Sequence, residues 1–251
     1  MENMTDNKLI TPLATAWNEF QGSYSEELAN KIINFEKRQK LRFRSVLDIC
    51  CGSGNLLKVM NANEKKCYAT EILDDFVTYN QQNNPFINIK KVNNILGFDN
   101  IKTFDLITCT NKVINNLNDI SLWSNFFNLV YKNLNNGGVF IFDYYTENQL
   151  NNWNKTTHKE TDTFDHVRNV ISTNNPLSST INDVFYLKKP DNKYKRINNI
   201  ETKYGFRNEV ILNEIKSAQF RYLIPVDANL KPIPSLNDSK IAYIIAIKRE
   251  G

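Results

Sequence analysis

The segment VLDICCGSGN, residues 46–55, decides how the chain folds. Its first half is apolar, as in a short buried strand, and its second half contains Gly52 and Gly54. Glycine has no side chain, so these two positions allow a tight turn and the close approach of a ligand to the backbone. The residues that follow indicate the start of a helix, whose first N–H groups have no partner within the helix. A strand, a glycine turn and a helix in this order predict a ligand site at the end of the strand.

A carboxylate is expected next to this turn. The segment KCYATEI, residues 66–72, indicates a second strand, and Glu71 closes it. An acid at the end of the neighbouring strand can accept hydrogen bonds from both ribose hydroxyls of a nucleoside. A dinucleotide would need a third glycine at position 57, where Leu57 stands, and the Gly-Lys-Ser/Thr of a phosphate loop is absent. The pattern therefore favours a nucleoside without a pyrophosphate.

The alternation of strands and helices continues to residue 145. Further strands are predicted at 87–92, 104–110 and 139–145, with a helix over 121–134. This order is typical of an α/β fold with a parallel sheet and helices on both faces. The segments 219–227 and 241–249 indicate two more strands, which we expect to form an antiparallel hairpin at the edge of the sheet. Between 153 and 204 short polar and apolar stretches alternate and predict a small antiparallel β insert.

Composition excludes several classes of protein. The 251 residues are 41% hydrophobic and carry a net charge of +4, which is weak for a nucleic-acid-binding module. One basic cluster, residues 37–44, is expected to be a solvated helix end. The apolar run at 241–247 is too short to span a bilayer, and the first residues do not resemble a secretory signal, so we expect a cytoplasmic protein. Four cysteines without CxxC spacing and two histidines predict no metal site.

At this point the chain resembles the class I S-adenosylmethionine-dependent methyltransferases. VLDICCGSGN is similar to their first motif, E/D-x-G-x-G-x-G, with Cys50 in place of the first glycine. ATEILDDF, residues 69–76, resembles their second motif, with Glu71 as the ribose acid. The segments 104–117 and 134–146 resemble the regions of their fourth and fifth strands. The likeness extends from Trp17 to Lys248 and is strongest to a subgroup that acts on small molecules.

This resemblance implies a Rossmann-like seven-stranded sheet, five parallel strands followed by the antiparallel edge hairpin. It implies S-adenosylmethionine as the cofactor and in-line transfer of a methyl group to a small-molecule nitrogen or oxygen nucleophile, without a metal. The N/D-P-P-Y motif of methyltransferases that act on bases or glutamine is absent. RNA or protein methylation and a non-catalytic regulator that binds the cofactor stay open as alternatives. A nicotinamide oxidoreductase is disfavoured by Leu57.

The expected domain organisation has four parts. They are an N-terminal helical lid over 1–40, the cofactor-binding core over 41–150, the β-rich insert over 151–204 as a lid on the substrate, and a C-terminal helix with edge strands over 205–251. Within the first part, Pro12 to Arg38 is predicted to be helical with a break at Gly22-Ser23.

The resemblance also implies which residues form the site. The predicted cofactor contacts are Trp17, Asp48, Cys50, Gly52, Ser53, Gly54, Glu71, Ile72, Asn94, Ile95, Cys109 and Thr110, and Asn111 and Tyr144 are predicted to face the reacting groups. Simpler roles remain possible for some of them. Trp17 could pack a helix, Asn94 could be a turn residue, and Tyr144 could belong to the core.

Overall fold

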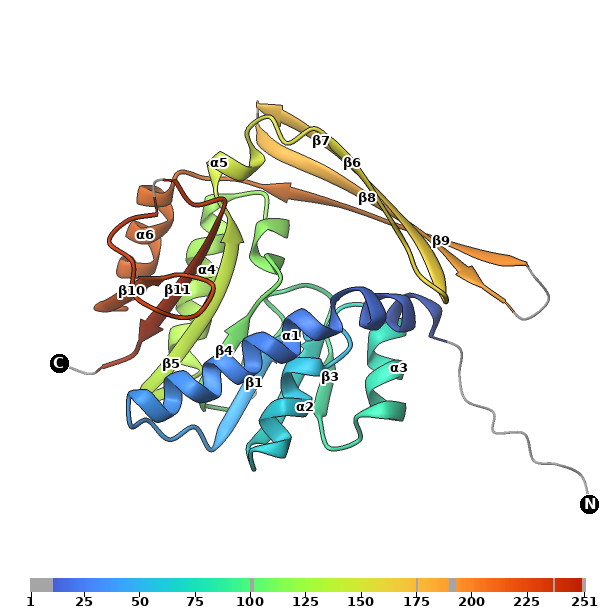
Figure 1. The fold of residues 1–251 in the computed structure, drawn as a ribbon. Helices are drawn as coiled ribbons and strands as arrows, with labels where there is room; N and C mark the ends of the chain where they lie inside the picture. Colours follow the sequence, from blue (N-terminus) through green and yellow to red (C-terminus); the bar gives the residue numbers. More distant parts are fainter. Residues whose placement is uncertain (1–10, 100–101, 175, 190–192, 237, 250–251) are drawn as a thin grey trace, which may run out of the picture.

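The computed structural model describes residues 11–99, 102–174, 176–189, 193–236 and 238–249. The first ten residues of the predicted N-terminal lid lie outside this part of the chain. The described residues form a seven-stranded sheet covered by helices, and a separate four-stranded antiparallel sheet that arches over one edge of it (Figure 1).

The central sheet has the strand order β10-β11-β5-β4-β1-β2-β3. Its strands are β1 (Ser45–Ile49), β2 (Lys66–Glu71), β3 (Asn88–Lys91), β4 (Phe104–Cys109), β5 (Leu134–Tyr145), β10 (Tyr222–Val226) and β11 (Ile241–Ile247). The first five are parallel, and β11 is antiparallel to both β5 and β10. The predicted seven-stranded α/β fold is confirmed. The apolar β11 takes the inner position of the hairpin, whereas β10, which contains Pro225, lies at the edge, where a missing N–H is tolerated.

Helices cover both faces of this sheet. They are α1 (Pro12–Arg38), α2 (Asn55–Ala62), α3 (Asp74–Asn83), α4 (Ile120–Lys132), α5 (Glu147–Leu150) and α6 (Asn208–Ser217), with a short 3₁₀ helix η1 (Val113–Asn116) after β4. Apolar residues of α1 and α2 form the core on one face, and those of α4 and α6 form the core on the other. The order of the strands therefore places the carboxyl ends of β1, β2 and β4 side by side.

The predicted break in the first helix is wrong, because α1 runs without interruption from Pro12 to Arg38. Gly22 lies where α1 crosses α2. A Cβ atom at Gly22 would come within 2.9 Å of Nδ2 of Asn55 and 3.3 Å of Oδ1 of Asn18. The glycine therefore permits close packing of two helices and does not end one.

The insert is an antiparallel sheet in the order β6-β7-β8-β9. Its strands are β6 (Lys155–Glu160), β7 (Phe164–Asn174), β8 (Leu177–Lys188) and β9 (Tyr194–Tyr204). Phe20 of α1 packs against this sheet, with ring centroids 4.2 Å from His166 and 5.9 Å from Phe185. The buried Asp183 of the insert accepts two hydrogen bonds from Arg168, and Phe164 and Phe185 share a small apolar cluster with Ala16 of α1. No described helix is long and apolar enough to cross a membrane.

Candidate functional site

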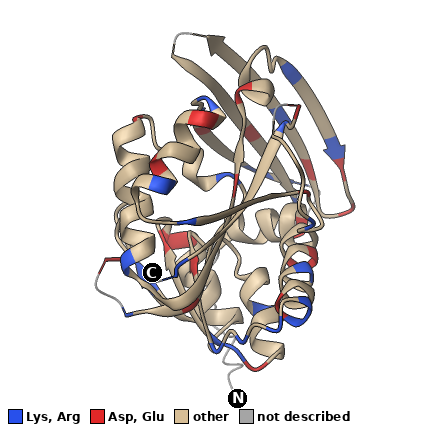
Figure 2. Ribbon diagram, turned by 90° about the vertical axis from the view of Figure 1, so that its left-hand side faces the viewer, with Lys and Arg blue, Asp and Glu red and all other residues tan. Residues whose placement is uncertain are grey.

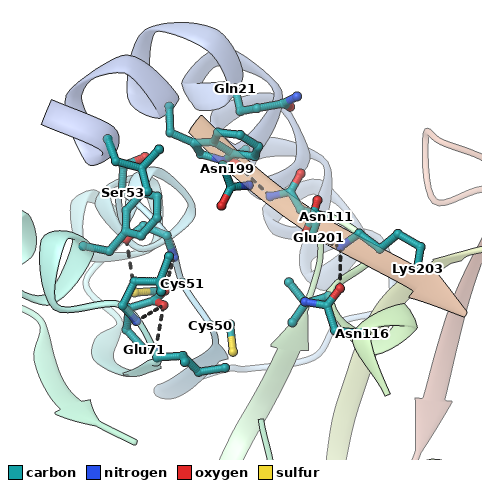
Figure 3. Close-up of a pocket in the computed structure, with 18 residues that line it drawn as sticks. Gln21, Cys50, Cys51, Ser53, Glu71, Asn111, Asn116, Asn199, Glu201 and Lys203 are labelled. Carbon is teal, nitrogen blue, oxygen red and sulfur yellow. Dashed lines mark hydrogen bonds and ion pairs between the residues drawn. The ribbon is translucent and has the colours of Figure 1, made fainter. Parts of the chain in front are cut away.

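A cavity of about 270 Å³ lies at the carboxyl ends of the parallel strands, between α1 and the insert (Figure 3). Three groups of residues line it, from the start of α1, from the ends of the core strands, and from η1 and β9. They are Leu13, Trp17, Gln21, Ser25, Cys50, Cys51, Gly52, Ser53, Glu71, Ile72, Leu73, Phe76, Asn111, Val113, Asn116, Asn199, Glu201 and Lys203. The lining therefore combines residues that are up to 190 positions apart in the sequence (Leu13 and Lys203).

The two glycines of the turn after β1 have different roles. Both have positive φ, +56° at Gly52 and +76° at Gly54. A Cβ atom at Gly52 would meet nothing within 4 Å, so this glycine borders open space in the cavity. A Cβ atom at Gly54 would lie 2.2 Å from Oδ1 of Asn80 and 2.9 Å from Cδ1 of Ile87. Gly54 thus permits the turn to pack against α3, and only Gly52 presents bare backbone to a ligand.

Glu71 fastens this turn to the end of β2. One carboxylate oxygen accepts the backbone N–H of Gly52 at 2.9 Å, and the other accepts those of Ile72 at 2.6 Å and Leu73 at 3.0 Å. Burial raises the pKa of Glu71 and the three N–H donors oppose that rise. The oxygen that faces Gly52 receives one hydrogen bond, and a carboxylate oxygen can accept two. Glu71 therefore retains the capacity to accept a hydrogen bond from a hydroxyl in the cavity.

Two further acids lie beneath the cavity. Asp48 is buried in β1 and accepts a hydrogen bond from Oγ1 of Thr108 at 2.7 Å. Burial raises the pKa of Asp48 to about 7, and the negative charges of Glu71 and Asp143 act in the same direction. Asp143, fully buried near the end of β5, accepts a hydrogen bond from the Tyr24 hydroxyl at 3.2 Å. Asp143 is compensated by the Lys112 ammonium 3.5 Å away, so Glu71 is the uncompensated acid nearest the glycine turn.

A strained turn after β4 directs Asn111 into the cavity. Asn111 and Lys112 both have φ of 60°, which is unusual for residues with a side chain. Asp143 holds this turn, since its carboxylate accepts the backbone N–H of Lys112 at 2.7 Å and lies 3.5 Å from Nζ of the same lysine. The Asn111 amide reaches Oγ of Ser25 on α1 at 3.5 Å. The buried acid therefore acts as a support for a side chain at the site.

Strand β9 closes the cavity on the side of the insert. Asn199, Glu201 and Lys203 alternate along it, so their side chains point to the same face of the strand (Figure 3). The ammonium group of Lys203 donates to Oδ1 of Asn116 at 2.8 Å and to the Lys112 carbonyl at 3.3 Å, and it forms an ion pair with Oε2 of Glu201 at 2.9 Å. These bonds tie the insert to η1 and bring a carboxylate to the cavity wall.

The structure brings only some of the predicted site residues to the cavity. Those that line it are Trp17, Cys50, Gly52, Ser53, Glu71, Ile72 and Asn111. Those outside the lining are Asp48, Gly54, Asn94, Ile95, Cys109, Thr110 and Tyr144. Burial raises the pKa of the Cys50 thiol well above its ordinary value, so this cysteine meets the cavity as a neutral group.

The residues outside the lining have other surroundings. Ile95 and Cys109 belong to the apolar core. Tyr144 is fully buried and donates its hydroxyl to Oδ1 of Asn208 at 3.0 Å. Asn94 is exposed and its side-chain oxygen accepts the backbone N–H of Leu96 at 2.9 Å, which is a turn contact. A cofactor contact of Asn94 and a catalytic role of Tyr144 stay predictions, and the burial of Tyr144 does not favour the latter.

Apart from Trp17, sequence reasoning missed the polar residues that the insert, η1 and α1 supply. They are Gln21, Ser25, Asn116, Asn199, Glu201 and Lys203. Polar residues occupy both faces of β9, so its pattern did not distinguish the inner face from the outer one. The signal was the Asn-x-Glu-x-Lys spacing at 199–203, which places three polar side chains on one face of a strand. No group of three or more metal-ligating side chains forms among the described residues.

The chain is similar to a known protein family and to solved structures. The family model described as "Methyltransferase domain" matches residues 20–175. No curated protein matches the sequence. A crystal structure of an S-adenosylmethionine-dependent methyltransferase from Clostridium acetobutylicum is 20% identical, covers 94% of this chain and 100% of its own, and superposes with a TM-score of 0.78.

Two further structures have related folds. CalS10, an amino pentose methyltransferase from Micromonospora echinaspora solved with bound S-adenosylmethionine, is 14% identical with a TM-score of 0.72, over 93% of this chain and 96% of its own. The sugar N-methyltransferase KedS8 from Streptoalloteichus is 15% identical with a TM-score of 0.69, over 92% of this chain and 87% of its own. At these identities the likeness supports the shared fold.

Proposed function

We propose a class of methyl acceptor for this protein. The premise is that the chain belongs to the methyltransferase domain family and is an S-adenosylmethionine-dependent methyltransferase. The proposed acceptor is a small, hydroxyl-rich amine, and the proposed product carries the methyl group on nitrogen. The observation that carries this proposal is the composition of the cavity wall opposite the glycine turn, in which amides, one hydroxyl, one carboxylate and the Lys203 ammonium outnumber the apolar side chains.

The end of the cavity next to the glycine turn suits the cofactor. Glu71 can accept hydrogen bonds from the ribose hydroxyls, and the bare backbone at Gly52, with Ser53 beside it, can lie along the methionine part. Ile72, Leu73 and Phe76 offer apolar surface to the adenine. When bound, the cofactor supplies a methyl group already activated by a sulfonium, so no further activation of the methyl donor is required. The protein then has to orient the acceptor and exclude water.

The opposite end of the cavity suits a polar acceptor. Asn111, Asn116 and Asn199 each carry an amide, and Gln21 and Ser25 of α1 add two more polar groups. Amide side chains donate and accept hydrogen bonds, which matches the donor and acceptor character of sugar hydroxyls. The carboxylate of Glu201 can only accept while ionised, which suits the N–H groups of an amine. This wall therefore favours an aminated polyol over an apolar or aromatic acceptor.

The solved relatives support nitrogen as the methylated atom. CalS10 is described as an amino pentose methyltransferase and KedS8 as a sugar N-methyltransferase. Each superposes over more than nine tenths of this chain, which includes the insert. An amino sugar is thus a substrate class that suits both the relatives and the amide-rich wall.

The arrangement of charge does not favour RNA as the acceptor. The basic residues at 37–44 precede β1, so they lie at the amino ends of the parallel strands, away from the cavity and the insert (Figure 1). Elsewhere Lys and Arg are interspersed with Asp and Glu along the helices and strands (Figure 2). A nucleic-acid site usually gathers positive charge on one face. The cytoplasmic location expected from the sequence stays a prediction.

An acceptor panel tests the proposal. Purified protein would be incubated with methyl-labelled S-adenosylmethionine and with the 2-, 3- and 4-amino-deoxyhexoses, the parent hexose, a catechol, total RNA and histones. We expect S-adenosylhomocysteine to accumulate only with an amino sugar, and the product to gain one methyl mass on nitrogen. Labelling only of the hydroxyl compounds, RNA or histones would contradict the proposal. Cofactor binding without any product would favour a regulator.

A further inference from the structure

We propose that Glu201 of β9 binds the amino group of the acceptor and that Lys203, two residues later, positions this carboxylate. The inference rests on the proposed function and deepens it, because it names the residue that selects an amine over a hydroxyl group. Neither residue belongs to a sequence motif. Both come from the insert, about 150 residues after the glycine turn (52 to 201 and 203).

Lys203 cannot itself serve the acceptor. The ammonium group of Lys203 donates hydrogen bonds to Oδ1 of Asn116 and to the Lys112 carbonyl, and it forms an ion pair with Oε2 of Glu201. Its side chain is only 4% exposed. Binding a ligand would require a buried charge to give up one of these partners, which is costly. Lys203 is therefore a fixed support.

Glu201 has the capacity that Lys203 lacks. Its Oε2 forms an ion pair with Lys203, and its Oε1 makes no hydrogen bond with the residues that the structure describes. The side chain is 27% exposed and lines the cavity, where Figure 3 shows it on β9 between Asn199 and Lys203. Arg168, the other cation near it, is bound to Asp183 in the core of the insert. An amine in the cavity can therefore donate an N–H to Oε1.

The other carboxylate in the lining differs in this respect. Glu71 accepts three backbone N–H groups and lies at the end of the cavity next to the glycine turn. Glu201 lies on the opposite wall and has one oxygen open. A neutral amine that donates its two N–H groups to Glu201 and to a neighbouring amide oxygen keeps its lone pair free. This arrangement lets the wall hold the nitrogen without blocking the electrons that it needs for methylation. The N–C bond to the methyl group then forms as the S–C bond of the cofactor breaks, and the methylated ammonium releases a proton to solvent.

The test uses Glu201→Gln, which keeps the size of the side chain and removes its charge. The ligands are the amino sugar that the wild-type protein methylates in the panel and the parent hexose, which has a hydroxyl in place of the amine. Each would be titrated calorimetrically into protein saturated with S-adenosylhomocysteine. We expect Glu201→Gln to lower the affinity for the amino sugar about 10- to 100-fold, because a charge-assisted hydrogen bond is lost. The affinity for the hydroxyl parent should fall less than about threefold. Affinity for S-adenosylhomocysteine should not change. The matched control is Glu160→Gln on β6, whose side chain is 69% exposed.

Lys203 is tested by a pair of variants. Lys203→Met removes the charge and should raise KM for the amino sugar about tenfold or more while kcat falls less, because the carboxylate is no longer held in place. Lys203→Arg should restore most of the KM. If Lys203 served only to stabilise the insert, the melting temperature would fall with Lys203→Met while KM stayed constant.

The outcomes separate this inference from the proposed function. If Glu201→Gln lowered the affinities for the amino sugar and for the hydroxyl parent equally, or lowered neither, the role of Glu201 would be overturned. A wild-type protein that methylates no amine would instead overturn the proposed function. Retained selectivity for the amine in Lys203→Met would overturn the positioning role of Lys203.

Discussion

The two ends of the cavity are built in different ways. The end at the glycine turn comes from the tips of β1 and β2, and its groups are fixed by backbone hydrogen bonds such as that from Gly52 to Glu71. The opposite end is completed by β9 of the insert, and its groups are fixed by side chains, chiefly the ammonium of Lys203. Backbone contacts at strand ends constrain which residues can stand there, whereas a side-chain wall can be rebuilt by substitution. The difference teaches that the end at the glycine turn, where we propose the cofactor, is set by the fold, whereas the end at β9, where we propose the acceptor, is set by side chains.

The strongest test of the first half of this comparison is the pair Gly54→Val and Gly52→Ala. At Gly54 a side chain would overlap Asn80 and adopt a positive φ, so we expect a loss of about 4 kcal/mol in the free energy of unfolding. At Gly52 the space is open, so Gly52→Ala should cost only about 1 kcal/mol, from its positive φ. Yet Gly52→Ala should weaken binding of S-adenosylhomocysteine at least about tenfold.

Urea unfolding and calorimetry distinguish the two glycines. The reverse pattern, with a stable Gly54→Val that binds poorly and a Gly52→Ala that binds normally, would mean that the ligand lies against Gly54. The assignment of Gly52 to the cavity would then be wrong.

Asp48 provides a pH-dependent test of the acids under the cavity. Its pKa is about 7 in the folded protein, against 3.8 when unperturbed, chiefly because of burial. Between these two values the folded state keeps a proton that the unfolded state releases, so the contribution of Asp48 to stability falls as pH rises through this window. Asp48→Asn has no such penalty. Relative to wild type it should gain about 2–4 kcal/mol in the free energy of unfolding from about pH 4 to about pH 8.

Urea titrations of both proteins at several pH values measure this gain. Parallel curves for Asp48→Asn and wild type would show that Asp48 keeps an ordinary pKa. The buried acids would then not shape the electrostatics of the site.

Glu71→Gln directly tests the end of the cavity at the glycine turn. The amide has one accepting oxygen in place of two, so at least one of the N–H groups of Gly52, Ile72 and Leu73 loses its partner. We expect affinity for S-adenosylhomocysteine to fall about 30- to 100-fold, equivalent to about 2–3 kcal/mol. Calorimetry with the folded variant, checked by circular dichroism, measures the loss. Unchanged affinity would show that Glu71 does not bind the ribose.

Phe20→Ala tests whether the insert can loosen independently of the core. Phe20 packs on His166 and Phe185, so its removal should weaken the contact between α1 and the insert by about 2 kcal/mol. Hydrogen exchange should become faster in the segment 155–204 and stay unchanged in β1 and β4. If hydrogen exchange became faster across the whole chain, the two sheets would unfold as one unit. The insert would then have no stability separate from that of the core.

Asn94→Ala is expected to have the smallest effect. If Asn94 meets the edge of the adenine, as the sequence suggests, affinity for S-adenosylhomocysteine should fall about three- to fivefold through loss of one neutral hydrogen bond. The side chain is exposed and already accepts the N–H of Leu96, so stability should change by less than about 1 kcal/mol. An identical affinity would leave Asn94 as a turn residue only.

The sequence predicted the core well because local rules determine it. The apolar run before Gly52, and the acid at the end of the next strand, follow from strand burial and turn geometry within about 30 residues. The wall formed by Asn199, Glu201 and Lys203 was not predicted. The Asn-x-Glu-x-Lys spacing places the three side chains on one face of β9, but polar residues on both faces conceal which face is inside. The break at Gly22 was predicted wrongly, since a glycine that permits helix packing looks the same in sequence as one that ends a helix.

The central claim is that one cavity holds the cofactor at Glu71 and the acceptor at β9. A crystal structure of the protein with S-adenosylhomocysteine tests it most directly. The account predicts that the ribose hydroxyls contact Glu71, that the amino-acid part lies along Gly52, and that the sulfur faces the space bounded by Asn111 and Glu201. A ligand bound elsewhere, or one whose sulfur points away from β9, would contradict the account.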